Sequence, residues 1–96
     1  MEYILRSSIS LNFIKKEHVT GSYQGMRYRL VNDGEGNIEV CIWPEPYNYI
    51  KTKDELKQFN KFPLDEEGKN ACVDWLNEQI DVQAMLWKTA RETPWV

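Results

Sequence analysis

The sequence contains little of what catalysis or metal binding requires. It has one histidine, His18, and two cysteines, Cys41 and Cys72, which lie far apart in the chain. It contains no G-x-S-x-G nucleophile motif, no phosphate-binding glycine loop, no dinucleotide-binding fingerprint and no H-E-x-x-H motif. Three scattered ligands fall short of the four that a structural zinc site uses. The sequence therefore predicts a protein that is not an enzyme and that uses neither a metal nor a cofactor.

Long apolar runs and a strong charge of either sign are also missing. No stretch approaches the ~18 apolar residues of a membrane span. The opening MEYILRSSISLNFIKKE lacks the order of basic, apolar and small residues that marks a secretory signal. We therefore expect a cytoplasmic protein with no membrane partner, whose cysteines are reduced and buried. A net charge of −3, from 12 basic and 15 acidic residues, is too acidic to favour phosphate-dominated binding of nucleic acid.

What the sequence does contain is a clear hairpin pattern at residues 25–43. Two alternating runs, MRYRLV and IEVCIW, flank a segment rich in turn residues, NDGEGN. Alternation with a period of two predicts two antiparallel strands with one apolar face. Pairing Leu30 with Ile38 keeps that face apolar throughout, and it sets Arg29 opposite Glu39 as a cross-strand ion pair.

The segment after the hairpin carries its own signals. Pro44 and Pro46 end the second strand, because proline cannot donate a hydrogen bond to the sheet. Thr52 and Glu55 fit a capping box at the start of a short helix over 53–58. Residues 59–64 then read as an edge strand, which tolerates a proline.

The C-terminal part is predicted to be helical over 66–91. Asp65 is a favourable N-cap, and the apolar residues that follow have helical spacing. The helix is either continuous or broken near Asp81, and 92–96 form a tail. The apolar stripe expected on its second half consists of Val82, Met85, Leu86 and Ala90. Trp87 lies off that stripe, and Trp87 or Trp95 would meet the N-terminal segment or another chain.

The N-terminal residues 1–24 give the weakest pattern. Ser10 is placed to cap a short helix over 11–17, and HVTGSYQG, residues 18–25, reads as a loop. Together these elements predict one α+β domain over 1–96. A small antiparallel sheet within 25–64, made of the hairpin and an edge strand near 59–64, packs on one face against the helical structure 66–91.

The stretch IWPEPYNY concentrates aromatic residues where the second strand ends. Trp43 continues the outward side of that strand, and the prolines hold the following segment extended. Tyr47 and Tyr49 then either fold back over the sheet or stay exposed as a rigid aromatic ledge. Because tryptophan, tyrosine and arginine dominate interface hot spots, we expect another protein, or a second copy of this chain, as the partner. The predicted contact residues are Trp43, Tyr47, Tyr49, Arg27 and Arg29.

Two alternatives remain open. Arg27 and Arg29 beside aromatic rings resemble the platforms on which single-stranded nucleic acid stacks, with further basic residues at Lys51, Lys53, Lys57 and Lys61. Alternatively, the protein is an acidic inhibitor of a nucleic-acid-handling enzyme, which steers itself to basic residues by charge. The acidic residues available for this role are Asp33, Glu35, Glu39, Glu45, Asp65, Glu66, Glu67, Asp74, Glu78 and Asp81.

Three segments, GMRYRL, WPEPY and DEEGKNACVDWLNEQ, carry a resemblance that covers residues 21–80. The chain resembles small uncharacterised proteins carried on conjugative and other mobile elements of Gram-positive bacteria. That resemblance implies an accessory or host-defence-related role, including inhibition of a nuclease system. It implies no catalytic or binding residue, because the family has no established activity.

Overall fold

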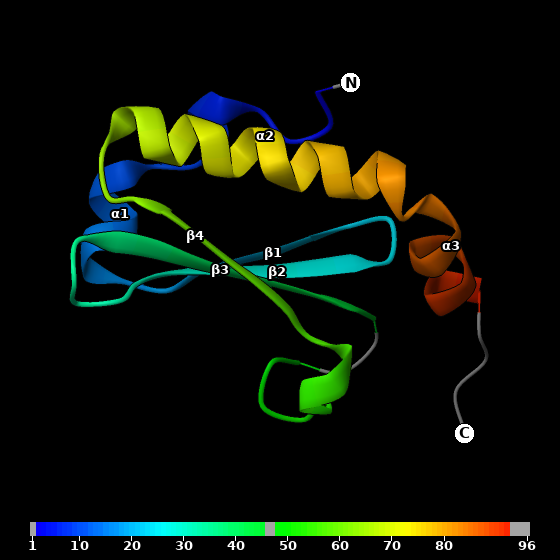
Figure 1. Ribbon diagram of the computed structural model, residues 1–96. Coiled ribbons are helices and arrows are strands. Elements are labelled where there is room, and N and C mark those ends of the chain that lie inside the picture. The colour runs from blue at the N-terminus through cyan, green and yellow to red at the C-terminus, as the bar shows by residue number, and fades with distance from the viewer. Residues whose placement is uncertain (1, 46–47, 93–96) are drawn as a thin grey trace.

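The computed structural model describes residues 2–45 and 48–92, and it consists of a four-stranded antiparallel sheet with helices across one face (Figure 1). Tyr47 and Trp95 lie outside these ranges. The strands are β1 (Val19–Tyr23), β2 (Met26–Asn32), β3 (Asn37–Pro44) and β4 (Gln58–Pro63), in that order across the sheet. The helices are α1 (Leu11–Lys16), α2 (Glu66–Val82) and α3 (Ala84–Glu92), with short 3-10 turns η1 (Arg6–Ser8) and η2 (Asp54–Leu56). The predicted α+β fold is confirmed.

The hydrophobic core lies between the sheet and α2. Alternate residues of β2 and β3 point toward the helix, as a period of two requires. They meet the inward side of α2. Asp65 caps the first turn of this helix by accepting a hydrogen bond from the Gly68 N–H at 2.6 Å. The residues that are fully buried in this layer include Met26, Leu30, Ile38, Val40, Ile42, Cys72, Val73 and Leu76.

The register of the β2–β3 hairpin differs by two residues from the predicted one. Leu30 pairs with Val40, and Arg29 pairs with Cys41 instead of Glu39. The predicted ion pair between Arg29 and Glu39 is therefore wrong, and Glu39 lies between Val31 and Lys61 of the neighbouring strands. Because the shift is an even number, every side chain keeps its predicted face.

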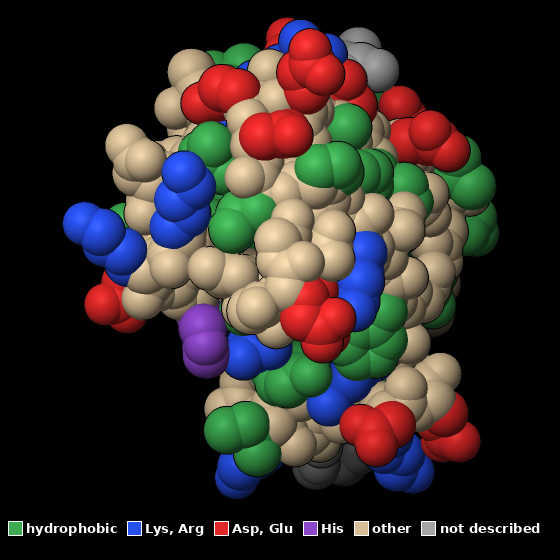
Figure 2. All heavy atoms as spheres, turned by 60° about the vertical axis from the view of Figure 1, so that its left-hand side comes forward, with side chains coloured by type: hydrophobic (Ala, Val, Ile, Leu, Met, Phe, Trp, Pro, Cys, Tyr) green, Lys and Arg blue, Asp and Glu red, His purple; other side chains and the backbone are tan. Residues whose placement is uncertain are grey.

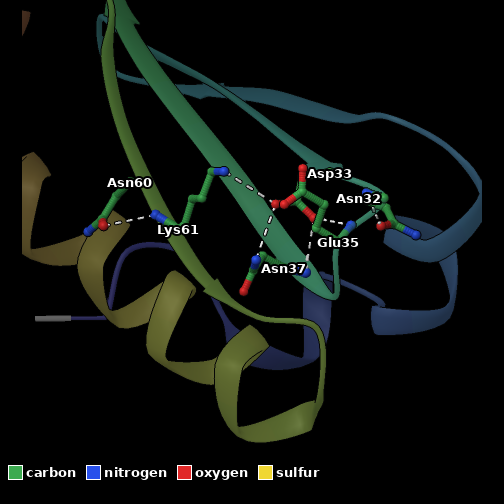
Figure 3. A network of polar contacts seen from close by, with 7 residues as sticks. Asn32, Asp33, Glu35, Asn37, Asn60 and Lys61 are labelled. Carbon is green, nitrogen blue, oxygen red and sulfur yellow. Dashed lines mark hydrogen bonds and ion pairs between the residues drawn. The ribbon is translucent and has the colours of Figure 1, made fainter.

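A polar network around Asp33 sets this register (Figure 3). The Asp33 carboxylate accepts hydrogen bonds from the backbone N–H groups of Glu35, at 2.8 Å, and Asn37, at 3.1 Å, and it lies 3.4 Å from the Lys61 ammonium group. Gly34 and Gly36 adopt positive φ values of 81° and 86°, which glycine reaches without steric cost. These contacts close a reversal that is two residues longer than the predicted one, since Leu30 pairs with Val40 and not with Ile38.

The segment 18–25, predicted to be a loop, instead contains β1 and a tight turn. β1 pairs with β2 along its whole length. The turn residues Gln24 and Gly25 have φ values of 43° and 102°, the conformation of a two-residue type I′ turn. A Cβ atom at Gly25 would lie 2.1 Å from the carbonyl oxygen of Trp87, so this close approach also requires glycine. The glycine, serine and threonine of this segment leave it without the apolar alternation from which a strand is predicted.

The N-terminal segment is held against α2 by buried polar groups. The Asn77 side chain accepts hydrogen bonds from the N–H groups of Tyr3 and Ile4 and donates one to the Ile4 carbonyl. Lys69 donates to the Arg6 carbonyl at 2.7 Å. The prediction that Ser10 caps a short helix is confirmed, because its hydroxyl accepts the Phe13 N–H.

The capping box predicted at Thr52 and Glu55 is wrong. Thr52 is buried, and its hydroxyl donates to the Asn48 carbonyl at 2.8 Å. The following helical segment is only the 3-10 turn η2, which begins after Lys53. Thr52 thus closes the loop that leads back to the sheet, where a helix over 53–58 was expected.

The C-terminal helical structure is broken, as one of the two predictions had it, and the break falls at Gln83. The Gln83 side chain exchanges two hydrogen bonds, of 2.8 and 2.9 Å, with the side chain of Gln58 on β4. This turn redirects α3, so the predicted core stripe is wrong: Val82 and Met85 are 70% and 74% exposed. Trp87 is buried instead, at 2% exposure, and packs on the β1–β2 turn.

Replacing Trp87 with alanine should therefore destabilise the fold by about 3–5 kcal/mol, because the change empties a large buried site. Met85→Ala, on the same helix, should alter the free energy of unfolding by less than about 0.5 kcal/mol. Urea denaturation of both variants measures the difference. Equal effects would contradict this orientation of α3.

Acid should weaken the Asp33 network. Hydrogen bonds from the Glu35 N–H and from Asn37, together with Lys61, lower the pKa of Asp33 below its ordinary value of 3.8. A carboxyl group with a lowered pKa stabilises the fold above its unfolded-state pKa, and this contribution disappears as the pH falls through the folded-state value. Asp33→Asn should therefore lower Tm at pH 7 and make Tm less dependent on pH below about 4. Glu35→Gln removes the same charge nearby and is the control.

Candidate functional site

The face of the sheet away from α2, called the outer face below, carries two cross-strand rows in which polar and apolar side chains are mixed. Cross-strand pairing sets Ser22, Arg27 and Trp43 side by side in one row. The next row contains Thr20, Arg29, Cys41 and Phe59. Arg27 and Arg29 therefore project from the same side of β2, as the alternation predicted, and β1 contributes two hydroxyl groups beside them.

The loop between β3 and β4 folds back over this face, and Tyr49 is its main contact. The Tyr49 ring lies edge-on to Trp43, with ring centroids 5.7 Å apart. The Arg29 guanidinium lies 4.2 Å and the Lys57 ammonium 4.0 Å from the centre of the Tyr49 ring. Of the two predicted arrangements, Tyr49 thus adopts the one that packs on the sheet. The expectation that Trp43 forms an exposed surface is wrong, since it is 3% exposed.

Between β1 and this loop lies a cavity of about 450 Å³. Arg27 and Arg29 of β2 form part of its lining, His18, Thr20 and Ser22 lie on the β1 side, and Asn48, Tyr49 and Ile50 lie on the loop side. Among the described residues, no carboxylate lines it. This volume falls in the range of ~300–1,000 Å³ that is typical of ligand pockets. The name outer cavity is used for it below.

One of the arginines that line the outer cavity has a donor without an acceptor. The Nε atom of Arg27 is buried and has no hydrogen-bond partner among the described residues. A buried donor without an acceptor costs free energy, and such a group in a native protein calls for an explanation. Arg29 meets the Nδ1 atom of His18 at 3.3 Å. The cavity therefore combines two guanidinium groups, an imidazole and hydroxyl groups, which together suit an anionic group.

Four of the five predicted contact residues line the outer cavity, namely Trp43, Tyr49, Arg27 and Arg29, and Tyr47 lies outside the described residues. Other lining residues, among them His18, Thr20, Ser22 and Ile50, were not predicted from the sequence to be contact residues. The alternation of Thr20 and Ser22 with Val19, Gly21 and Tyr23 was a strand signal that could have placed them beside the arginines. Ile50 is 87% exposed at the rim of the cavity, and nothing in the neighbouring sequence predicted that this apolar residue would be exposed.

The two cysteines are free and buried, as predicted, and have no role in the cavity lining. Burial raises the pKa of Cys41 to about 11, against the opposing effect of Lys57 and Arg29. Burial also raises the pKa of Cys72 to about 12. Both thiols therefore stay protonated near neutral pH, where a thiol is a poor nucleophile.

An acidic surface lies on the opposite side of the molecule, along the solvent side of α2. Figure 2 shows acidic side chains gathered over that helix, while most basic side chains in the view lie below them, over the sheet and loops. Asp74 pairs with Arg6 there, and Asp81 accepts a hydrogen bond from the Tyr3 hydroxyl. Hydrogen bonding to Arg6 lowers the pKa of Asp74. The other exposed acidic residues of this surface include Glu67 and Glu78.

Within the described ranges, no helix combines the length and the apolar character that a bilayer crossing demands. The same residues bring together no group of three or more His, Cys, Asp or Glu side chains that could hold a metal ion.

The chain matches no protein-family model, no curated protein and no solved structure.

The thiols offer a test of the loop that covers the outer face. At pH 8, Ellman's reagent should leave both cysteines of the native protein unmodified for hours and should modify both in 6 M guanidinium chloride. Tyr49→Ala removes the ring that holds the loop and should make Cys41 react in the native state, whereas Cys72 should stay protected. Rapid modification of Cys41 in the unaltered protein would contradict the observed position of the loop.

Proposed function

We propose that the protein is a non-enzymatic binding module that captures another protein in the cytoplasm, and that the outer cavity receives an acidic segment of that partner. One observation carries this proposal. Arg27, Arg29 and His18 line a single cavity, and no carboxylate among the described residues lines it to neutralise the two guanidinium groups. A desolvated guanidinium group forms stronger hydrogen bonds with a carboxylate than with a neutral acceptor.

The buried Nε of Arg27 supports binding as the role of this side chain. A guanidinium group whose task was stability would be expected to have its donors satisfied inside the protein. Arg27 lacks that satisfaction at Nε, an atom shielded from solvent, and an incoming acceptor would bind the part of the guanidinium group that lines the outer cavity. The rigid strand limits the entropy that this side chain loses on binding.

Binding of single-stranded nucleic acid is less well supported. That mode needs aromatic faces on which bases can stack. Trp43 is 3% exposed, and the Tyr49 ring already has the Arg29 and Lys57 cations 4.2 and 4.0 Å from its centre. A base would have to displace one of them.

The acidic-inhibitor alternative rests on the surface of α2. Two of its carboxylates are engaged within the chain, Asp74 by Arg6 and Asp81 by Tyr3, and Glu66 pairs with Lys69. Exposed Glu67 and Glu78 remain on this surface. The resemblance to proteins of mobile elements favours an accessory role, and capture of a partner protein would suit that role as well as inhibition would.

Arg27→Met tests the proposal with an acidic probe. The probe is a fluorescein-labelled peptide in which glutamate alternates with valine. We expect the unaltered protein to bind it with a salt-dependent affinity and Arg27→Met to weaken binding by about tenfold or more, since a charge-assisted hydrogen bond contributes ~1.5–3 kcal/mol. Tm should stay the same or rise, because the substitution removes a buried unsatisfied donor. Fluorescence anisotropy and calorimetry supply the two measurements.

Lys88→Met is the matched control. It removes the same charge from α3, outside the lining of the outer cavity, and should leave affinity for the peptide nearly unchanged. A peptide with lysine in place of glutamate should not bind. Absence of binding to the acidic peptide, or an equal loss in both variants, would overturn the proposal.

A further inference from the structure

We propose that the acidic segment binds as an additional β-strand along the free edge of β1, with alternate acidic side chains entering the outer cavity. This inference rests on the proposed function and adds the conformation, the sequence pattern and the backbone contacts of the partner segment. Its occupant is an extended acidic stretch of a partner protein.

The first support is the free edge of β1. β1 lies at one end of the strand order and pairs only with β2 among the described strands. Tyr23 and Met26 flank the two-residue turn, so they form the hydrogen-bonded pair at the end of this hairpin. Bonded and non-bonded pairs alternate along an antiparallel ladder. The N–H and C=O groups of Thr20 and Ser22 therefore point away from β2, toward the free edge.

The second support is the contrast with the other edge of the sheet. β4 carries the exposed Lys61 and ends at Pro63, two features that discourage further strand pairing. β1 has the sequence Val-Thr-Gly-Ser-Tyr, with neither a charge nor a proline. Of the two edges, only β1 lacks these protecting features.

The third support is that the free edge and the outer cavity share residues. Thr20 and Ser22 present their free backbone groups to the edge, and both line the cavity. In a strand paired antiparallel to β1, the residues opposite Thr20 and Ser22 place their side chains on the outer face as well. An arriving strand would therefore bind through its backbone at β1 and direct every second side chain toward the arginines.

The spacing of the arginines defines the pattern that fits. Arg27 and Arg29 are two residues apart on one strand, a rise of about 6.8 Å. Two acidic residues separated by one other residue have the same spacing in an extended peptide. The exposed Ile50 at the rim offers an apolar contact beside them. The inferred recognition pattern is thus acidic residue, any residue, acidic residue, with adjacent acids disfavoured.

Peptide isomers test this pattern directly. The alternating glutamate–valine peptide should bind at least about fivefold more tightly than an isomer of the same composition with its glutamates in one block. Two further versions carry backbone N-methyl groups, one on the glutamates and one on the valines. Successive N–H groups of a strand point to opposite edges, and the glutamates are the residues that lie opposite Thr20 and Ser22. Methylation of the glutamates should therefore abolish binding, and methylation of the valines should leave it nearly unchanged. Equal affinities of all four peptides would overturn strand addition.

Changes in β1 test the same contact from the protein side. Ser22→Pro removes an N–H group that faces the free edge, where proline is tolerated, and should weaken binding by about tenfold. Ser22→Ala loses the same hydroxyl group but keeps the N–H group, so it is the reference against which the tenfold loss is measured. If Ser22→Pro does not fold, hydrogen exchange of the unaltered protein provides the test of strand addition. The amides of Thr20 and Ser22 should become protected when the alternating peptide is added, whereas those of Gly21 and Tyr23 should be protected already.

The outcomes separate the two proposals. If the alternating peptide does not bind, both the proposed function and strand addition fail. If binding depends on Arg27 but N-methylation of neither set matters and Thr20 and Ser22 gain no protection, the proposed function stands and strand addition is wrong.

Discussion

The contact of Tyr49 with Arg29, Lys57 and Trp43 determines what the outer face of the sheet can do. A two-layer α+β domain leaves one face of its sheet without a covering helix, and this face must be polar or be covered. Here one part is covered, because Tyr49 packs on Trp43, and both Trp43 and Cys41 are buried. The other part, over β1 and β2, stays open as a cavity beside that loop. The same ring therefore separates a closed half of the face from an open half.

This division explains why two neighbouring arginines have different environments. Arg29 stacks on the Tyr49 ring and also approaches His18, so its position is fixed by the chain itself. Arg27 lies one row away, next to Ser22 and Trp43, and its Nε atom lacks a partner within the described chain. Binding sites commonly carry such groups at a cost to stability. The chain itself thus holds one arginine in place, and the other, Arg27, is the one to which we assign ligand binding.

The charges of the molecule are separated between its two layers. The exposed carboxylates of α2 lie on the helical side of the molecule, and the outer cavity, lined by two arginines, opens on the outer face of the sheet. A small net charge therefore conceals two surfaces of opposite sign. The overall charge of −3 argues against binding to a long polyanion, but it does not oppose a local anionic contact, because screening at physiological salt limits charge effects to roughly 8 Å.

Several elements could be predicted from the sequence, because side-chain pattern and local hydrogen bonding decide them. Alternation placed Arg27 and Arg29 on the outer face, Asp65 and Ser10 marked helix starts, and the apolar spacing predicted helical structure that packs on the sheet. These properties depend on neighbours within a few residues.

Other features depend on contacts between residues far apart in the chain, and the sequence pattern could not predict them. The bonds of Asp33 with Asn37 and Lys61 fixed the register, and the contact of Gln83 with Gln58 redirected α3 and exchanged the buried and exposed sides of that helix. The strand β1 became visible only through its pairing with β2, since a strand without a strong apolar pattern is stabilised by its neighbour. The cavity belongs to this second group, because its walls come from four stretches of the chain that come together only on folding.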